Sequence, residues 1–259
     1  MSQNAVGGRV WPASGDWSGW ADLWEGRMQA FFPRRQQSIA AVGDILTELL
    51  PAGPWRLLDL GAGTGSLARV LLQRFPEATV AAVDLDPVLL AIGRGALGDG
   101  GGRLSWRQLD LRAPGWAAAL ADDDARPFDA VVSLATLHHF ASGEVAAIYR
   151  DLAGLIRPDG LVLNADGLAD GSPHAPLARH FRDVRRSSAP PQDFWWEAIR
   201  ADPAFAGAVA ERDALRERMR GASRKLSAQA HARMLKQAGF ADALVAWRVF
   251  DETVVVARR

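Results

Sequence analysis

The sequence predicts an α/β fold built on a mostly parallel β-sheet, and three observations support this class. Short apolar runs alternate with amphipathic helical patterns between residues 56 and 164. Turn-forming residues separate these elements, as at residues 98–102 and 158–160. Two further apolar runs near the end of the chain meet at Asp251 and Glu252. Alternation predicts parallel strands with helices on both faces, whereas a joint this short permits only an antiparallel pair.

The expected strands are short runs rich in apolar residues, and they span residues 56–60, 79–84, 104–109, 130–135, 161–164, 243–249 and 253–257. The expected helices between them have apolar residues at helical spacing, and they span residues 66–74, 87–97, 113–121, 144–155 and 228–238. We therefore expect the last strand to lie antiparallel to its neighbours.

Two segments fall outside this alternation. Before the first strand, apolar and aromatic side chains recur every three or four residues, at Trp17, Trp20, Trp24, Met28 and Phe31. This spacing predicts one face of a helix, and a second helix is expected over residues 34–50. Residues 167–226 are rich in Arg and Pro and have helical patterns without strands.

We therefore expect three parts in the chain. Residues 1–33 form an N-terminal helical segment. Residues 34–166 and 227–259 form the core. Residues 167–226 form a helical substrate cap, inserted after the fifth strand, because an insertion of this length needs a function.

Composition excludes several classes of protein. The 259 residues are 49% hydrophobic and 23% charged, as in an ordinary globular protein. The formal net charge is zero, so the basic excess typical of nucleic-acid binders is absent. There are no cysteines, which excludes disulfides and thiolate sites, and no carboxylate–histidine cluster has metal-ligand spacing. With no long apolar run, we expect a soluble cytoplasmic protein without a membrane or nucleic-acid partner.

A glycine-rich loop joins the first expected strand to its helix, and two carboxylates follow the next two strands. The loop contains Gly61, Gly63 and Gly65, whose lack of a Cβ permits a sharp turn and close approach of a ligand. Asp84 ends the second strand, where a carboxylate can accept the hydroxyl hydrogens of a ribose. Asp110 follows the third strand, where it can accept a hydrogen bond from an adenine amine. Together these residues predict an adenosine-shaped pocket.

Four motifs identify a family resemblance. Asp59-Leu60-Gly61-Ala62-Gly63-Thr64-Gly65 resembles the first motif of class I S-adenosylmethionine-dependent methyltransferases. Residues 128–140, ending in Leu137-His138-His139-Phe140, resemble their fourth motif in a His-His version. Residues 155–161 and 235–240 resemble the turn before the fifth strand and the helix end before the sixth. The resemblance covers about residues 34–166 and 227–257.

This resemblance implies a Rossmann-like, seven-stranded, mostly parallel sheet with an antiparallel last strand and a helical cap insertion. It also implies S-adenosyl-L-methionine as the cofactor. The residues it assigns to the cofactor are Asp59, Gly61, Ala62, Gly63, Asp84, Leu85, Asp110, Leu111 and Leu134. Among them, Asp84 would bind the ribose and Asp110 the adenine, with Leu85 and Leu111 on either side of the ring. Asp59 would help to hold the amino group.

A nicotinamide dinucleotide is the competing cofactor. Its binding fingerprint is G-x-G-x-x-G, in which the third glycine packs the helix against the strand. Here the spacing is G-x-G-x-G, and Ser66 occupies the position of the third fingerprint glycine. A dehydrogenase fold would also leave Asp110 and the antiparallel last strand unexplained.

Candidate residues for the chemistry follow the fourth strand. His138 and His139 lie where the methyl group would sit, and an imidazole can accept a proton at neutral pH. The alternative is that they only bond the loop backbone. Asp166 follows the fifth strand, where it could line the substrate side or cap a loop.

Aromatic residues in the insertion are the other candidates for contact with the substrate. Phe194, Trp195 and Trp196 could stack on a flat substrate and exclude water, or could instead pack the cap onto the core.

The sequence thus predicts methyl transfer to an O, N or C atom of a small-molecule metabolite. The first rival is an RNA or protein methyltransferase, against which the neutral charge and the lack of an appended binding domain count. The second is a non-catalytic cofactor-binding protein. The acceptor and the oligomeric state are left open.

Overall fold

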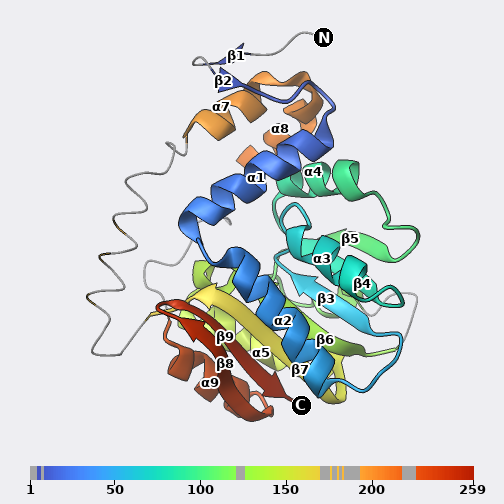
Figure 1. The fold of residues 1–259 in the computed structure, drawn as a ribbon, viewed down its shortest axis with the longest axis vertical. Coiled ribbons are helices and arrows are strands. Elements are labelled where there is room, and N and C mark those ends of the chain that lie inside the picture. Colours follow the sequence, from blue (N-terminus) through green and yellow to red (C-terminus); the bar gives the residue numbers. More distant parts are fainter. Residues whose placement is uncertain are drawn as a thin grey trace.

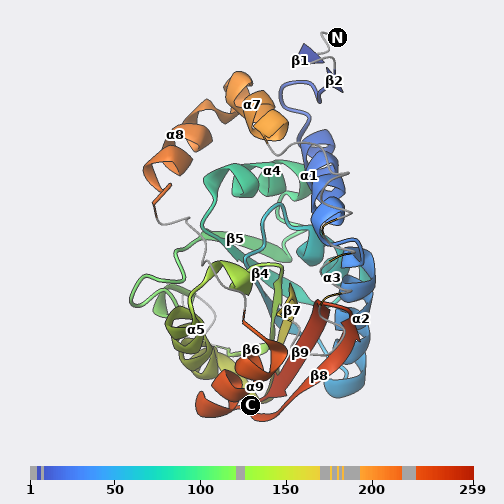
Figure 2. The same cartoon turned by 90° about the vertical axis from the view of Figure 1, so that its left-hand side faces the viewer.

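A computed structural model describes residues 5–6, 9–120, 126–169, 193–217 and 226–259, together with residues 176, 180 and 183. A β-sheet with helices on both faces forms the body of the molecule (Figure 1). Further helices lie above one edge of this sheet, at the upper end of both Figure 1 and Figure 2.

The sheet has seven strands in the order β5-β4-β3-β6-β7-β9-β8. Its strands are β3 (Arg56–Leu60), β4 (Thr79–Asp84), β5 (Leu104–Gln108), β6 (Phe128–Leu134), β7 (Ile156–Gly167), β8 (Ala241–Val249) and β9 (Glu252–Arg258). Strands β5 to β7 pair in parallel, and β9 is antiparallel to both β7 and β8. The predicted α/β class and the antiparallel last strand are therefore confirmed. Chain order reverses beside β3, at the kind of switch point where such sheets bind ligands.

Each face of the sheet has its own apolar core, because successive side chains of a strand point to opposite faces. Leu57 packs on the face covered by α2 (Arg35–Leu49) and α3 (Ser66–Arg74). Leu58 packs on the face covered by α5 (Ser142–Leu155) and α9 (Ala228–Gln237). Figure 2 shows α2 and α5 on opposite sides of the strands. Both cores hold the carboxyl edge of the sheet rigidly.

A third, aromatic core joins the N-terminal helix to the insertion. It lies among α1 (Trp17–Phe31), α4 (Pro87–Leu97), α7 (Asp193–Ala201) and α8 (Ala206–Ala214). Its buried members are Trp11, Trp20, Val88, Leu89, Ile92, Trp195, Ala198, Ile199 and Phe205. The Trp20 ring meets Phe205 edge-on at 5.4 Å between centroids. The proposed division into N-terminal segment, core and cap stays a prediction, but the two outer segments share one core in the described residues.

The remaining short elements are β1 (Ala5–Val6), β2 (Arg9–Val10) and the 3₁₀ turns η1 (Ala118–Leu120), η2 (Leu137–His139) and η3 (Pro203–Phe205). η2 follows β6 and carries both candidate histidines.

The prediction of a helix over residues 113–121 is wrong for those of its residues that the structure describes. Only η1 is helical there, and residue 121 lies outside the described residues. Pro114 and Gly115 break the pattern, and Gly115 has a φ of +81°. Trp116 instead anchors the loop, because its indole Nε1 donates a 2.8 Å hydrogen bond to Asp151.

The fifth strand is longer than the expected residues 161–164. β7 begins at Ile156, which pairs with Phe128, and resumes pairing at Leu161 with Ala130. The turn residues between them form an irregularity within the strand rather than a break before it. The other predicted strands of the sheet differ from the structure only at their ends.

Candidate functional site

The glycine loop packs tightly against the end of β6. Gly61 has a φ of +80°, and a Cβ added there would lie 2.1 Å from the Cγ2 of Thr136. Thr136 Oγ1 donates a 3.1 Å hydrogen bond to the Gly61 carbonyl oxygen. Gly63 has a φ of +57°, but its Cβ would meet nothing nearer than the Trp24 Nε1 at 3.8 Å. The loop therefore presents open backbone at Gly63 and a fixed wall at Gly61.

Asp84 is bonded to the loop from the neighbouring strand. Its Oδ2 accepts a 2.7 Å hydrogen bond from the Gly63 amide, and its Oδ1 accepts one of 2.8 Å from the Asp86 amide. Burial is the main reason that the pKa of the Asp84 carboxyl is raised to about 6. A carboxylate has about four acceptor positions, so these backbone bonds do not use the full acceptor capacity of Asp84.

A cavity of about 780 Å³ opens above the carboxyl ends of β3, β4 and β6. All but one of the predicted cofactor residues line it, namely Gly61, Ala62, Gly63, Asp84, Leu85, Asp110, Leu111 and Leu134. Asp110 follows β5, and its Oδ1 accepts a hydrogen bond of 2.9 Å from the Arg112 amide. The loop and both strand-end carboxylates thus meet in one space, and its volume is within the range of small-molecule sites.

Asp59 is the exception, because it lies behind the loop and does not line the cavity. It is 1% exposed, and its Oδ2 accepts a 3.1 Å hydrogen bond from the Ala68 amide of α3. Its Oδ1 has no hydrogen-bond partner among the described residues. Burial raises the pKa of the Asp59 carboxyl to about 7.

The free energy of unfolding is expected to fall as pH rises from about 4 to about 7. The usual pKa of Asp59 is near 3.8, so the folded state binds more protons than the unfolded state between that pH and about 7. Asp84 acts in the same direction up to about pH 6, whereas His231, whose pKa is lowered to about 4, acts in the opposite direction above that pH and reduces the net fall. Thermal unfolding of the ligand-free protein between pH 5 and 8 measures this. Asp59→Asn should remove the part of the fall above pH 6, and Asp242→Asn, at an exposed carboxylate, should leave it intact. Equal slopes in the wild type and Asp59→Asn would contradict the assignment.

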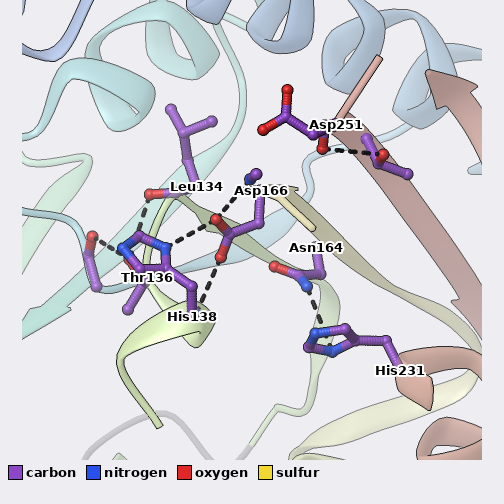
Figure 3. Close-up of polar contacts among 10 residues, drawn as sticks. Leu134, Thr136, His138, Asn164, Asp166, His231 and Asp251 are labelled. Atoms are coloured by element: carbon purple, nitrogen blue, oxygen red, sulfur yellow. Dashed lines mark hydrogen bonds and ion pairs between the residues drawn. The ribbon is translucent and has the colours of Figure 1, made fainter. Parts of the chain in front are cut away.

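His138 and Asp166 form a hydrogen-bonded pair at the cavity wall (Figure 3). Asp166 Oδ1 lies 2.8 Å from the His138 Nδ1, and Asp166 Oδ2 accepts a 3.1 Å hydrogen bond from the His138 amide. The His138 ring lines the cavity. Asp166 does not line the main cavity, and its side chain has 0% exposure. Of the two alternatives for Asp166, this position behind His138, bonded to the loop backbone, fits the loop-capping one.

A second cluster of polar side chains surrounds Asn164 of β7, in the core of the protein. Asn164 faces His231 in Figure 3, and the Tyr149 hydroxyl is 2.7 Å from the His231 Nδ1. His231 is 1% exposed, and burial lowers its pKa to about 4. The imidazole is therefore neutral and packed in the core, away from the cavity.

Some of the remaining candidate residues line the cavity, and the others pack in the core. His139 is exposed and lines the cavity. Of the aromatic trio in α7, only Trp196 lines the cavity. Trp195 is 5% exposed and packs against Trp24 at 5.0 Å, and Phe194 packs against the same aromatic core.

One wall of the cavity contains residues that were not among the predicted site residues. It comes from α1 and the start of α2, with Trp24, Arg27, Met28, Ala30, Phe31, Phe32, Pro33 and Arg35. The β8–β9 turn adds Asp251 and Glu252. The aromatic spacing of α1 predicted a helix, but such spacing does not reveal against which part of the fold the helix packs. Arg35 is held by a buried ion pair with Glu25, at 3.0 Å.

Within the described part of the chain, no group of histidine and carboxylate side chains has the arrangement of a metal site. No helix there has the length and apolar character that crossing a membrane requires.

Comparisons with known proteins agree with this geometry. The methyltransferase domain family matches residues 57–160. The trans-aconitate 2-methyltransferase of Streptomyces avermitilis is 32% identical over 127 residues, which cover 48% of this chain and 44% of that protein. The ribosomal RNA small subunit methyltransferase H of a Methylobacterium species is 32% identical over 168 residues, 62% of this chain and 49% of that protein. The matched parts are less than half of these relatives.

The fold has a solved counterpart as well. The crystal structure of the S-adenosylmethionine-dependent methyltransferase SibL in its apo form aligns with a TM-score of 0.60 and 19% sequence identity. The alignment covers 94% of this chain and 61% of SibL. Residues 57–160 thus match a methyltransferase domain, and the sheet as a whole has the fold of a solved S-adenosylmethionine-dependent methyltransferase.

Proposed function

We propose that this protein transfers a methyl group from S-adenosylmethionine to a small molecule that carries a hydroxyl or an acidic N–H group. One observation supports this most strongly. A single cavity joins the glycine loop and two strand-end carboxylates to a histidine that is paired with a buried aspartate. The glycine loop and the two carboxylates suit an adenosyl group. The histidine–aspartate pair suits removal of a proton from an acceptor.

The residues present fit the cofactor. Asp84 lines the cavity, and its carboxylate has acceptor capacity beyond its bonds from the Gly63 and Asp86 amides, which would serve the ribose hydroxyls. The backbone at Gly63 is open toward the cavity. Leu85 and Leu111 line the same cavity as Asp110, which would accept a hydrogen bond from an adenine amine. When bound, S-adenosylmethionine supplies an electrophilic methyl group on a sulfonium.

His138 would act as the general base. Asp166 would accept a hydrogen bond from His138 Nδ1–H, which favours the neutral tautomer whose Nε2 carries the free lone pair. That nitrogen can take a proton from an acceptor hydroxyl as the oxygen attacks. Asp166 does not touch the acceptor and acts as a positioning residue, held by further bonds from the Gly167 and His138 amides.

The acceptor would lie between His138 and the helix α1. The wall there is apolar and aromatic, with Met28, Phe31, Phe32 and Phe140 lining the cavity. Phe32 lies against the His138 ring, 5.9 Å between ring centroids. Such a wall excludes water and favours a flat, partly aromatic acceptor. Side chains of α1, α7 and α8 line the cavity together with the strand ends, which favours a small molecule over a macromolecule.

A screen for product formation tests the proposal. The protein is incubated with S-adenosylmethionine and a panel of small phenols, carboxylic acids and amines, and S-adenosylhomocysteine release is measured. Mass spectrometry then identifies any panel member that has gained one methyl group. We expect turnover with a phenol or another acid of similar pKa. Methylation of added ribosomal RNA instead, or cofactor binding without turnover of any acceptor, would contradict the small-molecule assignment.

A further inference from the structure

Helix α8 of the insertion contacts the two strand ends that carry the cavity carboxylates. Arg212 Nε donates a 2.7 Å hydrogen bond to Asp86 Oδ2, and Asp86 stands two residues after Asp84. Gln108 Nε2 donates a 2.5 Å hydrogen bond to Glu211 Oε1, and Gln108 stands two residues before Asp110. One helix turn of the insertion therefore bridges the ends of β4 and β5.

The ion pair between Arg212 and Asp86 is supported by further contacts of both side chains. Its guanidinium carbon lies 3.6 Å from the centroid of the Trp196 ring, a close cation–π stack. The side chains of Arg212 and Asp86 are 23% and 5% exposed, so the ion pair is largely shielded from water. The other oxygen of Asp86 caps α4 by accepting a 3.0 Å bond from the Val88 amide.

Helix α7 is tied to α8 by an ion pair. Arg200 of α7 forms a two-pronged ion pair with Asp213 of α8, at 2.6 and 2.7 Å. Trp195 and Ile199 of α7 are buried in the aromatic core against α1. Both Trp196 and Arg212 line the same cavity as Asp84 and Asp110.

We infer that Arg212 and Trp196 form a clamp, supplied by the insertion, that closes the nucleoside end of the cofactor cavity. The inference rests on the proposed function. Residues of the core bind the adenosyl group from the sheet side, and the clamp covers it from the opposite side. Arg212 also neutralises Asp86, whose charge otherwise acts on Asp84 through the short segment between them. The clamp should therefore slow cofactor release and should act on the nucleoside alone.

Ligand dissociation measured by stopped flow tests the clamp. The probes are S-adenosylhomocysteine and 5′-methylthioadenosine, which keeps the nucleoside and lacks the amino-acid part. Arg212→Gln should weaken both ligands by about tenfold, mostly through faster dissociation. Trp196→Leu should have a similar effect. Arg216→Gln removes the same charge four residues further on, at an exposed position away from the cavity, and should change neither ligand by more than about twofold.

The outcomes separate the two proposals. If the wild-type protein binds neither ligand, the proposed function fails. If it binds both and Arg212→Gln matches Arg216→Gln, the clamp is wrong. Loss for S-adenosylhomocysteine without loss for 5′-methylthioadenosine would also overturn it, because Arg212 would then act on the amino-acid end. Should Arg212→Gln not fold, Arg212→Lys keeps the charge but loses the stacked guanidinium plane, and at least about threefold weaker binding is expected.

Discussion

Replacing His138 by glutamine is expected to lower kcat by about 10²–10⁴-fold, the usual contribution of a general base. Glutamine keeps a polar side chain of similar reach but cannot take up a proton. The affinity for S-adenosylhomocysteine should stay within about twofold, because His138 is not among the residues proposed to bind the cofactor. Steady-state kinetics with the acceptor found by the screen, and calorimetry with S-adenosylhomocysteine, measure the two effects separately.

Two further variants sharpen this result. Asp166→Asn should lower kcat as well, since an amide no longer fixes the Nδ1–H tautomer of His138. The pH dependence of kcat should also differ between Asp166→Asn and the wild type. His139→Gln, at the neighbouring exposed histidine, should cost less than about tenfold. A base role for His138 is contradicted if His138→Gln turns over normally, or if His139→Gln loses as much.

Replacing Asp84 by alanine is expected to weaken S-adenosylhomocysteine binding by about 10²–10⁴-fold. Two hydrogen bonds from ribose hydroxyls to a carboxylate contribute about 1.5–3 kcal/mol each, and about 1.4 kcal/mol is a factor of ten in affinity. The fold should survive, since the Asp84 carboxyl carries a raised pKa and therefore costs stability when charged. Calorimetric titration measures the affinity, and thermal unfolding checks the fold.

Asp44→Ala is the matched control for Asp84→Ala. Asp44 is also an aspartate, its side chain is 69% exposed, and it pairs with Arg74 away from the cavity. It should bind S-adenosylhomocysteine like the wild type. Unchanged binding by Asp84→Ala would show that the ribose lies elsewhere.

The sheet could be predicted because its signals are local. Each strand from β3 to β5 is a short apolar run followed by turn chemistry, and the runs match the structure within one residue. Asp84 and Asp110 followed from the same reasoning, since the ends of parallel strands meet at one edge. The expected helix at 113–121 failed because alanines favour a helix but Pro114 and Gly115 override them.

The aromatic residues that line the cavity could not be told from those of the core, because the difference depends on long-range packing. Trp24 and Trp196 lie far apart in sequence, and both line the cavity only because the aromatic core docks α1 onto α7. The role of Trp195 shows the same limit, since a tryptophan next to Trp196 points into that core instead. Asp166 was left open between lining the substrate side and capping a loop, and its burial behind His138 could not be seen from its position after a strand.

A crystal structure of the complex with S-adenosylhomocysteine is the most direct test of the shared cleft. The account predicts both ribose hydroxyls within hydrogen-bond distance of the Asp84 carboxylate and the adenine amine at Asp110. A ligand bound in any other part of the molecule, or with its ribose turned away from Asp84, would contradict it.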